Sequence, residues 1–378
     1  MIMHPFEEPI LVTRPFLPSH QEFSEALKEI WANRWLTNNG PVVQRFASAL
    51  SRKFSSPNLS LFNNGTLALQ VGLQALGVSG EVITTPFTFV ATTHALYWNK
   101  VRPVFADIEP DHYTLDPQSV EAAITPWTTA ILAVHVYGHP CRLEALADIA
   151  ARHNLKLIYD AAHAFGVEVD GQPISAFGDM SMFSFHATKL FHSLEGGMLT
   201  FNQPLMKNTV DYLKNFGFEN EVEVVMPGTN AKMNEIQALM GELMLTHLSE
   251  ILVERKAVYE RYCERLKNVP GIKLVSPLDA GVTYNYAYMP IEIDPDKFGI
   301  GRDDLYEGLK RYNVFARRYF YPLVCDYACY RGLPITGSLT VARKVADRVL
   351  TLPIYPDLPL ESVDRICDMV VSMSAVRV

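Results

Sequence analysis

Short apolar runs alternate with amphipathic segments through the first two hundred residues of the chain. The runs LSLF, EVITT, VRPVFA, TTAILAVHV and LKLIYD predict strands at 59–62, 81–85, 101–106, 128–136 and 155–160. The segments between them, TLALQVGLQAL, VATTHALYW and RLEALADIAARH, have helical spacing, and MSMFSF (180–185) and GGMLTF (196–201) add two strands. Alternating strands and helices predict an α/β fold with a mostly parallel central sheet and helices on both faces.

Helical patterns also flank this region. Two helices are predicted at 20–32 and 41–54, separated by the polar run NRWLTNNGP. A longer helix is predicted at 231–267, and its apolar stripe is formed by Met233, Ile236, Met240, Leu243 and Met244. Beyond it, the pattern predicts strands near 284–293 and 314–317 and helices near 302–312, 340–350 and 361–375. We therefore expect a large domain, 1–250, with an N-terminal arm, and a small C-terminal α/β domain, 251–378.

Composition narrows the class of protein. The 378 residues are 48% hydrophobic and 20% charged, as is ordinary for globular proteins, and the net charge of −8 predicts no nucleic-acid partner. The N-terminus has acidic residues and prolines where a signal peptide needs a basic start and an apolar core, so we expect a cytoplasmic protein without a membrane partner. The five cysteines are scattered and predict neither a disulfide framework nor a metal site.

Three motifs carry candidate chemistry, and the first is NNGTLAL at 63–69. A predicted strand ends at Phe62 and a helix follows, so free N–H groups at the helix N-terminus favour a phosphate, which Gly65 lets approach the backbone. The alternative is a tight turn in which Thr66 caps the helix.

The second motif is YDAAHAFG at 159–166. The apolar run LKLIY places Asp160 at the carboxyl end of a strand, where ligands bind in open α/β sheets. A carboxylate there can keep a ring nitrogen protonated. The alternative is a carboxylate that only caps a helix.

The third motif is FSFHATKLFHSLEGGMLTF at 183–201, which places Lys189 between two strands. Most lysines are solvated surface charges, but apolar neighbours flank this one, and Ser184 and Thr188 offer hydroxyls to a phosphate. A lysine in such surroundings can become a nucleophilic amine.

Other cofactor sites have less support. The histidine pairs His186/His192 and His135/His139 lack accompanying Cys, Asp or Glu ligands, and neither G-x-G-x-x-G after an early strand nor G-x-x-x-x-G-K-[ST] is present. A phosphate cup, a carboxylate and a lysine, in that order, are the parts needed to hold pyridoxal 5′-phosphate (PLP).

The chain resembles the DegT/DnrJ family of sugar aminotransferases, a branch of the fold type I PLP-dependent enzymes. The resemblance covers nearly the whole chain, through WLTNNGP, NNGTLAL, TTPFTFVATTHAL, PVFADIEPD, VHVYGHP, YDAAHAFG, SFHATKLFHSLEGG and GTNAKMNEIQA. It implies a seven-stranded central sheet, a small C-terminal domain and a homodimer with shared active sites.

Residue roles follow from the same resemblance. It implies that Lys189 carries PLP as a Schiff base and moves protons, and that Asp160 pairs with the pyridine nitrogen. The remaining cofactor contacts it implies are His163 near the cofactor hydroxyl, Phe89 stacked on the ring, Gly65, Thr66 and Ser184 on the phosphate, and Asn230, with Lys232 as a weaker candidate, across the dimer interface. Phe89 has a core aromatic as its alternative.

The resemblance also implies a reaction, in which L-glutamate gives its amino group to C4 of a dTDP-linked 4-keto-6-deoxyhexose, dTDP-4-dehydro-6-deoxy-D-glucose. Candidate substrate residues are Trp35, Thr37, Asn39, Tyr319 and Tyr321, which could equally be packing and surface residues. Alternatives are a 3-ketosugar aminotransferase, a sugar dehydratase of the same fold, in which histidine typically replaces the lysine, and a non-catalytic regulatory protein.

Overall fold

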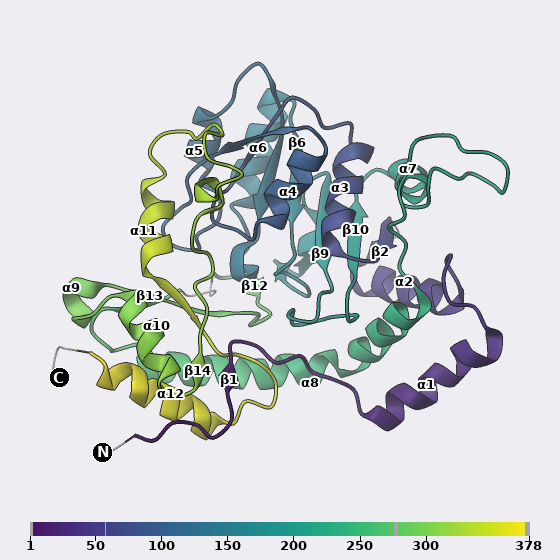
Figure 1. The fold of residues 1–378 in the computed structure, drawn as a ribbon. Coiled ribbons are helices and arrows are strands. Elements are labelled where there is room, and N and C mark those ends of the chain that lie inside the picture. The colour runs from purple at the N-terminus through teal and green to yellow at the C-terminus, as the bar shows by residue number, and fades with distance from the viewer. Residues whose placement is uncertain (1–2, 57, 276–278, 375–378) are drawn as a thin grey trace.

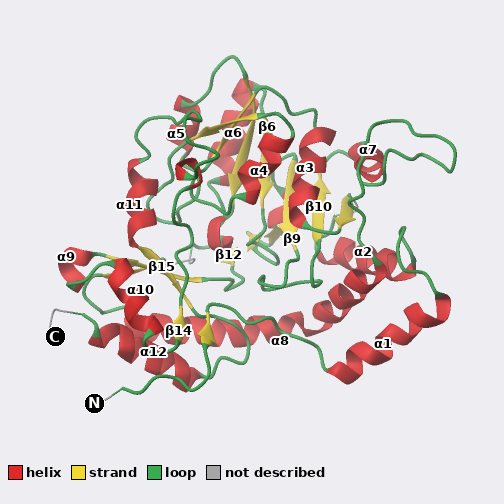
Figure 2. Cartoon of the chain, viewed as in Figure 1, coloured by secondary structure: helices red, strands yellow, loops and turns green. Residues whose placement is uncertain are grey.

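A seven-stranded sheet forms the centre of the protein in a computed structural model that describes residues 3–56, 58–275 and 279–374 (Figures 1 and 2). Its strand order is β2-β10-β9-β6-β5-β3-β4. The strands are β2 (Leu59–Phe62), β3 (Glu81–Thr84), β4 (Arg102–Phe105), β5 (Thr128–Val134), β6 (Lys156–Asp160), β9 (Met180–Ser184) and β10 (Gly197–Phe201). The strand β10 runs antiparallel to the other six strands, which all run in the same direction. The predicted mostly parallel α/β sheet is therefore confirmed.

Helices cover both faces of the sheet, because the strands present apolar side chains on both faces. Val82 and Ile158 belong to one core with α3 (Gly65–Ala75), α4 (Ala91–Trp98) and α7 (Met206–Leu213). The adjacent Ile83 and Leu157 belong to another core on the opposite side, with α5 (Pro117–Ala122) and α6 (Leu143–His153). Successive residues of a strand point to opposite faces, so a strand buried on both sides is apolar throughout.

Three helices, α1 (His20–Asn33), α2 (Pro41–Lys53) and α8 (Glu235–Leu266), lie beneath the sheet in Figure 1. The Glu235 carboxylate accepts the N–H groups of Val42 at 2.9 Å and Val43 at 3.0 Å, which joins the first turns of α2 and α8. The sequence pattern predicted that the helix corresponding to α8 begins at residue 231. It begins at Glu235 instead, because Asn234 and Gln237 form a capping box there.

By length and composition alone, α8 could cross a membrane. Its buried residues include Met240, Met244 and Ile251, which pack in the core with α1 and α2. It also carries the buried Arg255. We therefore interpret α8 as a core helix.

The C-terminal region has its own core and a three-stranded sheet of order β11-β13-β15. Its elements are β11 (Ile272–Leu274), β13 (Met289–Ile293), β14 (Val314–Phe315), β15 (Val349–Leu352), α9 (Pro295–Phe298), α10 (Arg302–Lys310), α11 (Thr340–Arg348) and α12 (Leu360–Ser372). The N-terminal strand β1 (Ile10–Leu11) pairs with β14. A further small sheet contains β7 (Glu168–Val169), β8 (Gln172–Pro173) and β12 (Val282–Thr283).

Several predicted boundaries in this region were wrong. The predicted strand at 284–293 begins only at Met289, and the predicted helix at 340–350 ends at Arg348, where β15 starts. The helix predicted at 361–375 ends at Ser372, and residue 375 lies outside the described part of the chain. The division into domains 1–250 and 251–378 stays a prediction, and its boundary falls inside α8.

Candidate active site

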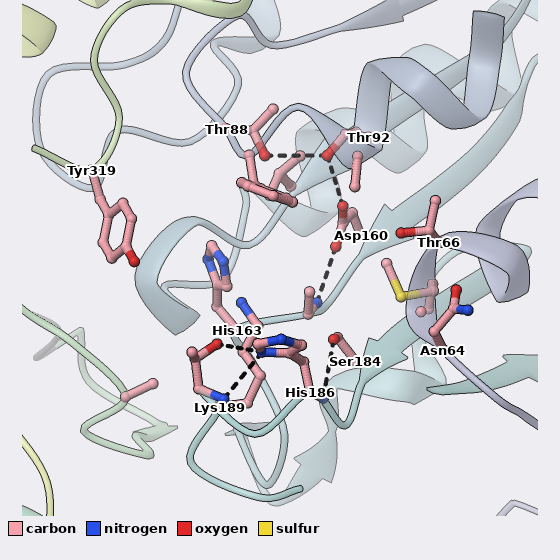
Figure 3. A pocket seen from close by; sticks show the side chains of 18 of the residues that line it. Asn64, Thr66, Thr88, Thr92, Asp160, His163, Ser184, His186, Lys189 and Tyr319 are labelled. Carbon is pink, nitrogen blue, oxygen red and sulfur yellow. Dashed lines mark hydrogen bonds between the residues drawn. The ribbon is translucent and has the colours of Figure 1, made fainter. Parts of the chain in front are cut away.

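A cavity of about 810 Å³ opens at the carboxyl ends of the central strands, the end of the sheet that the sequence predicted (Figure 3). The first turn of α3, the start of α4, the ends of β6 and β9 and the C-terminal region all contribute to its wall. Val12 and Thr13 of the N-terminal segment also line it. Predicted site residues in this wall are Gly65, Thr66, Phe89, Asp160, His163, Ser184, Lys189 and Tyr319.

Lys189 sits in the loop between β9 and β10, and buried aromatic residues fix that loop. Phe191 stacks on Phe165 with ring centroids 4.1 Å apart, and Phe185 lies edge-on to both rings. The Lys189 backbone N–H closes a turn onto the His186 carbonyl at 2.9 Å. The amine therefore projects into the cavity from a braced loop, and is not the solvated surface lysine of the alternative interpretation.

Asp160 ends β6 as a buried carboxylate. Its Oδ2 accepts the Thr92 hydroxyl at 2.8 Å, and its Oδ1 accepts the Ala162 N–H at 3.0 Å, as Figure 3 shows. Burial raises the pKa of this carboxyl, whereas these hydrogen bonds and Lys189 oppose the rise. A cationic ring nitrogen would stabilise the charged form further. No helix starts at Asp160, so it is not a helix-capping residue.

His163 follows three residues later and is also buried. Its ring lies nearly parallel to Phe320, with centroids 5.8 Å apart, and burial holds its pKa well below the ordinary value. Because Nδ1 accepts the Tyr137 N–H at 3.1 Å, the neutral ring carries its proton on Nε2. His163 can therefore donate a hydrogen bond to a ligand oxygen.

The start of α3 forms a cup opposite the end of β9. The Asn64 side chain caps the helix by accepting the Leu67 N–H at 2.8 Å, so Asn64, and not Thr66, is the N-cap. A Cβ added at Gly65 would lie 3.1 Å from the Ser184 Cβ, and one at Gly197 only 2.7 Å from the Asn64 carbonyl. The missing side chains let the helix N-terminus, with its free first-turn N–H groups, meet Ser184 closely.

Phe89 is 59% exposed although it lines the cavity, which excludes the alternative of a core aromatic. Tyr319 also lines the cavity, and its carbonyl accepts the Tyr137 hydroxyl. Phe89 and Tyr319 lie far apart in the sequence and line the same cavity.

The other predicted residues lie outside this wall in one chain. Trp35, Thr37 and Asn39 are exposed in the α1–α2 loop, where the Trp35 Nε1–H donates to the Thr37 carbonyl at 2.6 Å. Tyr321 packs under the Arg302 guanidinium, 4.6 Å from its ring centroid. Their substrate roles stay predictions.

Asn230 lies on the segment between α7 and α8, where its Oδ1 accepts the Lys232 ammonium at 2.9 Å. Neither side chain lines the cavity of its own chain. Their predicted role is across a dimer interface and also stays a prediction.

Some residues that contact Asp160 and Lys189 in the cavity were not predicted from the sequence. Thr88 and Thr92 form a hydroxyl chain to Asp160, with 3.2 Å between their Oγ1 atoms. Their spacing of four in TTPFTFVATTHAL, at the start of a predicted helix, was an available signal. Tyr288, which contacts Lys189, lies inside the strand predicted at 284–293, and nothing in that pattern marked it as a site residue.

The residues present fit PLP. A buried carboxylate, a lysine amine, a histidine donor and a phosphate cup at Gly65 surround one cavity, and its volume leaves room for a ligand beside the cofactor. Asp160 would hold the ring nitrogen, Lys189 would bind the aldehyde carbon, and Gly65, Thr66 and Ser184 would hold the phosphate.

Comparisons with known proteins show which family the chain belongs to. The chain is 45% identical to a dTDP-4-amino-4,6-dideoxy-D-glucose transaminase of Shigella dysenteriae, over 95% of this chain and 98% of that protein. It is also 45% identical to an Escherichia coli protein of the same name, over 95% and 97% of the two chains. Among solved structures, DesI in the presence of its TDP-sugar product has a TM-score of 0.93 at 37% identity, covering 98% of this chain and 94% of DesI.

A second structure, the Helicobacter pylori aminotransferase PseC, has a TM-score of 0.90 at 26% identity, over 97% of this chain and 99% of its own. The model of the DegT/DnrJ/EryC1/StrS aminotransferase family matches residues 19–371. The chain belongs to the DegT/DnrJ/EryC1/StrS aminotransferase family, whose cofactor is PLP.

Proposed function

We propose that this aminotransferase moves an amino group from L-glutamate to C4 of a nucleotide-linked 4-keto-6-deoxyhexose, with dTDP-4-dehydro-6-deoxy-D-glucose as the acceptor. The observation that carries the proposal is 45% identity, over 95% of the chain, to two proteins named for the corresponding 4-amino sugar. Two proteins named for 3-amino-3,4,6-trideoxy sugars are 32% and 30% identical. The difference favours amination at C4.

Lys189 is the proposed catalytic residue. When bound, PLP supplies a ring that accepts the electrons of the carbon atom losing a proton. Nζ of Lys189 would hold the cofactor by its aldehyde carbon, and in its free form Nζ would move protons: as an amine it accepts one, and as an ammonium it returns one. Its braced loop fixes the backbone from which Nζ reaches into the cavity.

The remaining wall residues hold and orient. Asp160, fixed by Thr92 and the Ala162 N–H, would hold the ring nitrogen of the cofactor through its carboxylate. His163 donates from Nε2 because its Nδ1 is occupied by the Tyr137 N–H. Phe89 and Tyr319 border the open side, where they can cover the cofactor ring and the sugar.

A homodimer is part of the proposal. The segment between α7 and α8 protrudes from the body of the protein in Figure 1. It exposes apolar side chains, namely Phe216, Phe218, Val222, Val224 and Val225. Exposed apolar side chains gathered on one segment favour a protein contact, and Asn230 follows on the same segment.

The test is to offer dTDP-linked 4-keto and 3-keto sugars with L-glutamate and to identify the amino sugar by NMR. The 4-keto sugar should be aminated at C4, with 2-oxoglutarate formed in equal amount. Amination of the 3-keto sugar alone would contradict the C4 assignment. Equal turnover with other amino acids and none with glutamate would contradict the donor assignment.

A further inference from the structure

Tyr288 places its hydroxyl oxygen 3.2 Å from Nζ of Lys189. Its ring is half-buried against three aromatic neighbours, with centroid distances of 4.8 Å to His163, 5.6 Å to Tyr137 and 6.0 Å to Tyr319. Within the described residues, no other side chain hydrogen-bonds Nζ. The Tyr288 hydroxyl is therefore held against Nζ of Lys189, the atom that moves protons in the proposed reaction.

The segment that carries Tyr288 is tied to the turn that carries His163. Asn285 is buried, and its Nδ2 donates to the His163 carbonyl at 2.8 Å and to the Phe165 carbonyl at 3.0 Å. Its Oδ1 accepts the Ala287 N–H at 3.2 Å. The Asn285 side chain therefore links the turn after β6, which carries His163, to Ala287, the residue before Tyr288.

The buried guanidinium of Arg255 also fixes the segment that carries Tyr288. Arg255 of α8 donates to the Tyr286 carbonyl at 3.0 Å and to the Ala287 carbonyl at 2.7 Å. In the described part of the chain its guanidinium has no ion pair with a carboxylate, and burial lowers its pKa to about 10. Burying an ion without a counter-ion is costly, so this guanidinium strongly constrains the two residues before Tyr288.

We propose that Tyr288 is a positioning residue that holds and orients the Lys189 amine, on a segment fixed by Asn285 and Arg255. The inference rests on the proposed role of Lys189. The hydroxyl accepts a hydrogen bond from the ammonium and can donate one to the free amine, so it can accompany Nζ through both protonation states. It restricts the directions from which the amine can meet a substrate C–H, and such orientation accelerates proton transfer.

Other titratable groups share the pocket with Lys189. They are Asp160, His163, His186, Glu195 and Tyr319, and His186 pairs with Glu195 at 3.4 Å. All of them remain in a Tyr288→Phe variant, which removes one oxygen and keeps the ring. A change in the behaviour of Lys189 in that variant therefore reports on the Tyr288 hydroxyl.

The matched control is Tyr286→Phe, which removes the same atom two residues away. The Tyr286 ring packs on Tyr259 and Tyr284, with centroids 5.4 and 5.3 Å away, and does not line the cavity. Tyr288→Leu gives a second measurement if the phenylalanine variant does not fold, and circular dichroism melts check all three proteins.

The first readout uses cofactor-free protein and follows reductive methylation of Lys189 with formaldehyde by peptide mass spectrometry. Removing the hydroxyl frees the Lys189 amine from the one side-chain hydrogen bond that holds it, so Lys189 should react about three- to tenfold faster in Tyr288→Phe. The second readout uses the loaded enzyme, where kcat with L-glutamate should fall about tenfold at nearly unchanged KM, with PLP absorbance retained. Tyr286→Phe should match the unaltered protein in both.

The inference would be overturned if the Lys189 methylation rate and the kcat of Tyr288→Phe both lay within twofold of the values for the unaltered protein. A lower affinity for PLP with unchanged Lys189 reactivity would also overturn it, because that pattern belongs to a packing residue. Failure of the underlying function looks different, since Lys189→Ala would then retain turnover whatever Tyr288 does.

Discussion

Replacing Asp160 with asparagine removes one negative charge from the pocket and changes little else. The side chain of asparagine has nearly the same shape, so its Oδ1 can still accept the Ala162 N–H. Its Nδ2 then faces Thr92, whose hydroxyl can turn to accept from it or to donate to Thr88, 3.2 Å away. Because both hydrogen-bonded positions can be satisfied, we expect the fold to survive.

The expected loss is electrostatic. Asp160 is buried, and its raised pKa reflects the energy needed to keep a charge in this position. That charge is useful only against a cationic ring nitrogen, which asparagine stabilises poorly. Removing one preorganised electrostatic partner from a water-excluded site costs about 10²- to 10³-fold in kcat, so we expect a loss of about 100-fold or more.

Stopped-flow absorbance with L-glutamate alone isolates the donor half of the reaction. Asp160→Asn should bind PLP, melt within a few degrees of the unaltered protein and react about 100-fold more slowly. Asp148→Asn, on the exposed surface of α6, makes the same chemical change outside the site and should react normally. A rate for Asp160→Asn within a fewfold of normal would refute the assignment of the carboxylate.

Three further predictions test the dimer, the cup and the buried histidines. Mixing Lys189→Ala and Asn230→Ala chains should restore part of the activity that each homodimer lacks, and full activity from a verified monomer would contradict shared sites. Gly197→Ala should raise the Kd for PLP about tenfold, because the new Cβ meets the Asn64 carbonyl at 2.7 Å, whereas Gly301→Ala, whose nearest contact is 3.7 Å, should not. Burial lowers the pKa of His135 to about 3, so the unfolded chain binds a proton below about pH 6.5 that the folded chain does not bind at His135. Between about pH 7 and pH 5, denaturant titration should show the unaltered protein losing up to about 2 kcal/mol more stability than His135→Gln.

The central sheet was predictable because its strands are buried on both faces. Runs such as LKLIYD are apolar at consecutive positions, Leu157 to Tyr159, and their core assignment alternates between Leu157 and Ile158 as strand geometry requires. The strand β15 was missed because VARKVADRVLTL continues a helical pattern past Arg348. Pairing with β13 decides its structure, and that pairing joins residues about sixty positions apart, beyond any local pattern.

Some residues of the candidate site were likewise predictable from the sequence, and others were not. Gly65, Asp160 and Lys189 were recognisable because each lies at or after the end of a predicted strand, and the carboxyl ends of parallel strands meet at one edge of the sheet. Tyr288 was not, because its contact with Lys189 joins segments 99 residues apart and depends on buried bonds made by Asn285 and Arg255. Those bonds exist only once the C-terminal region has packed against the sheet.

The central claim is that Lys189 carries the cofactor, and borohydride reduction tests it most directly. Reducing the PLP-loaded protein fixes the cofactor on whichever amine holds it, and peptide mass spectrometry then locates the added mass. We expect it on Lys189 within SFHATKLFHSLEGG, and expect L-glutamate added before the reductant to abolish it. Label on another lysine, such as Lys214 or Lys232, or none at all in protein that turns over, would contradict the account.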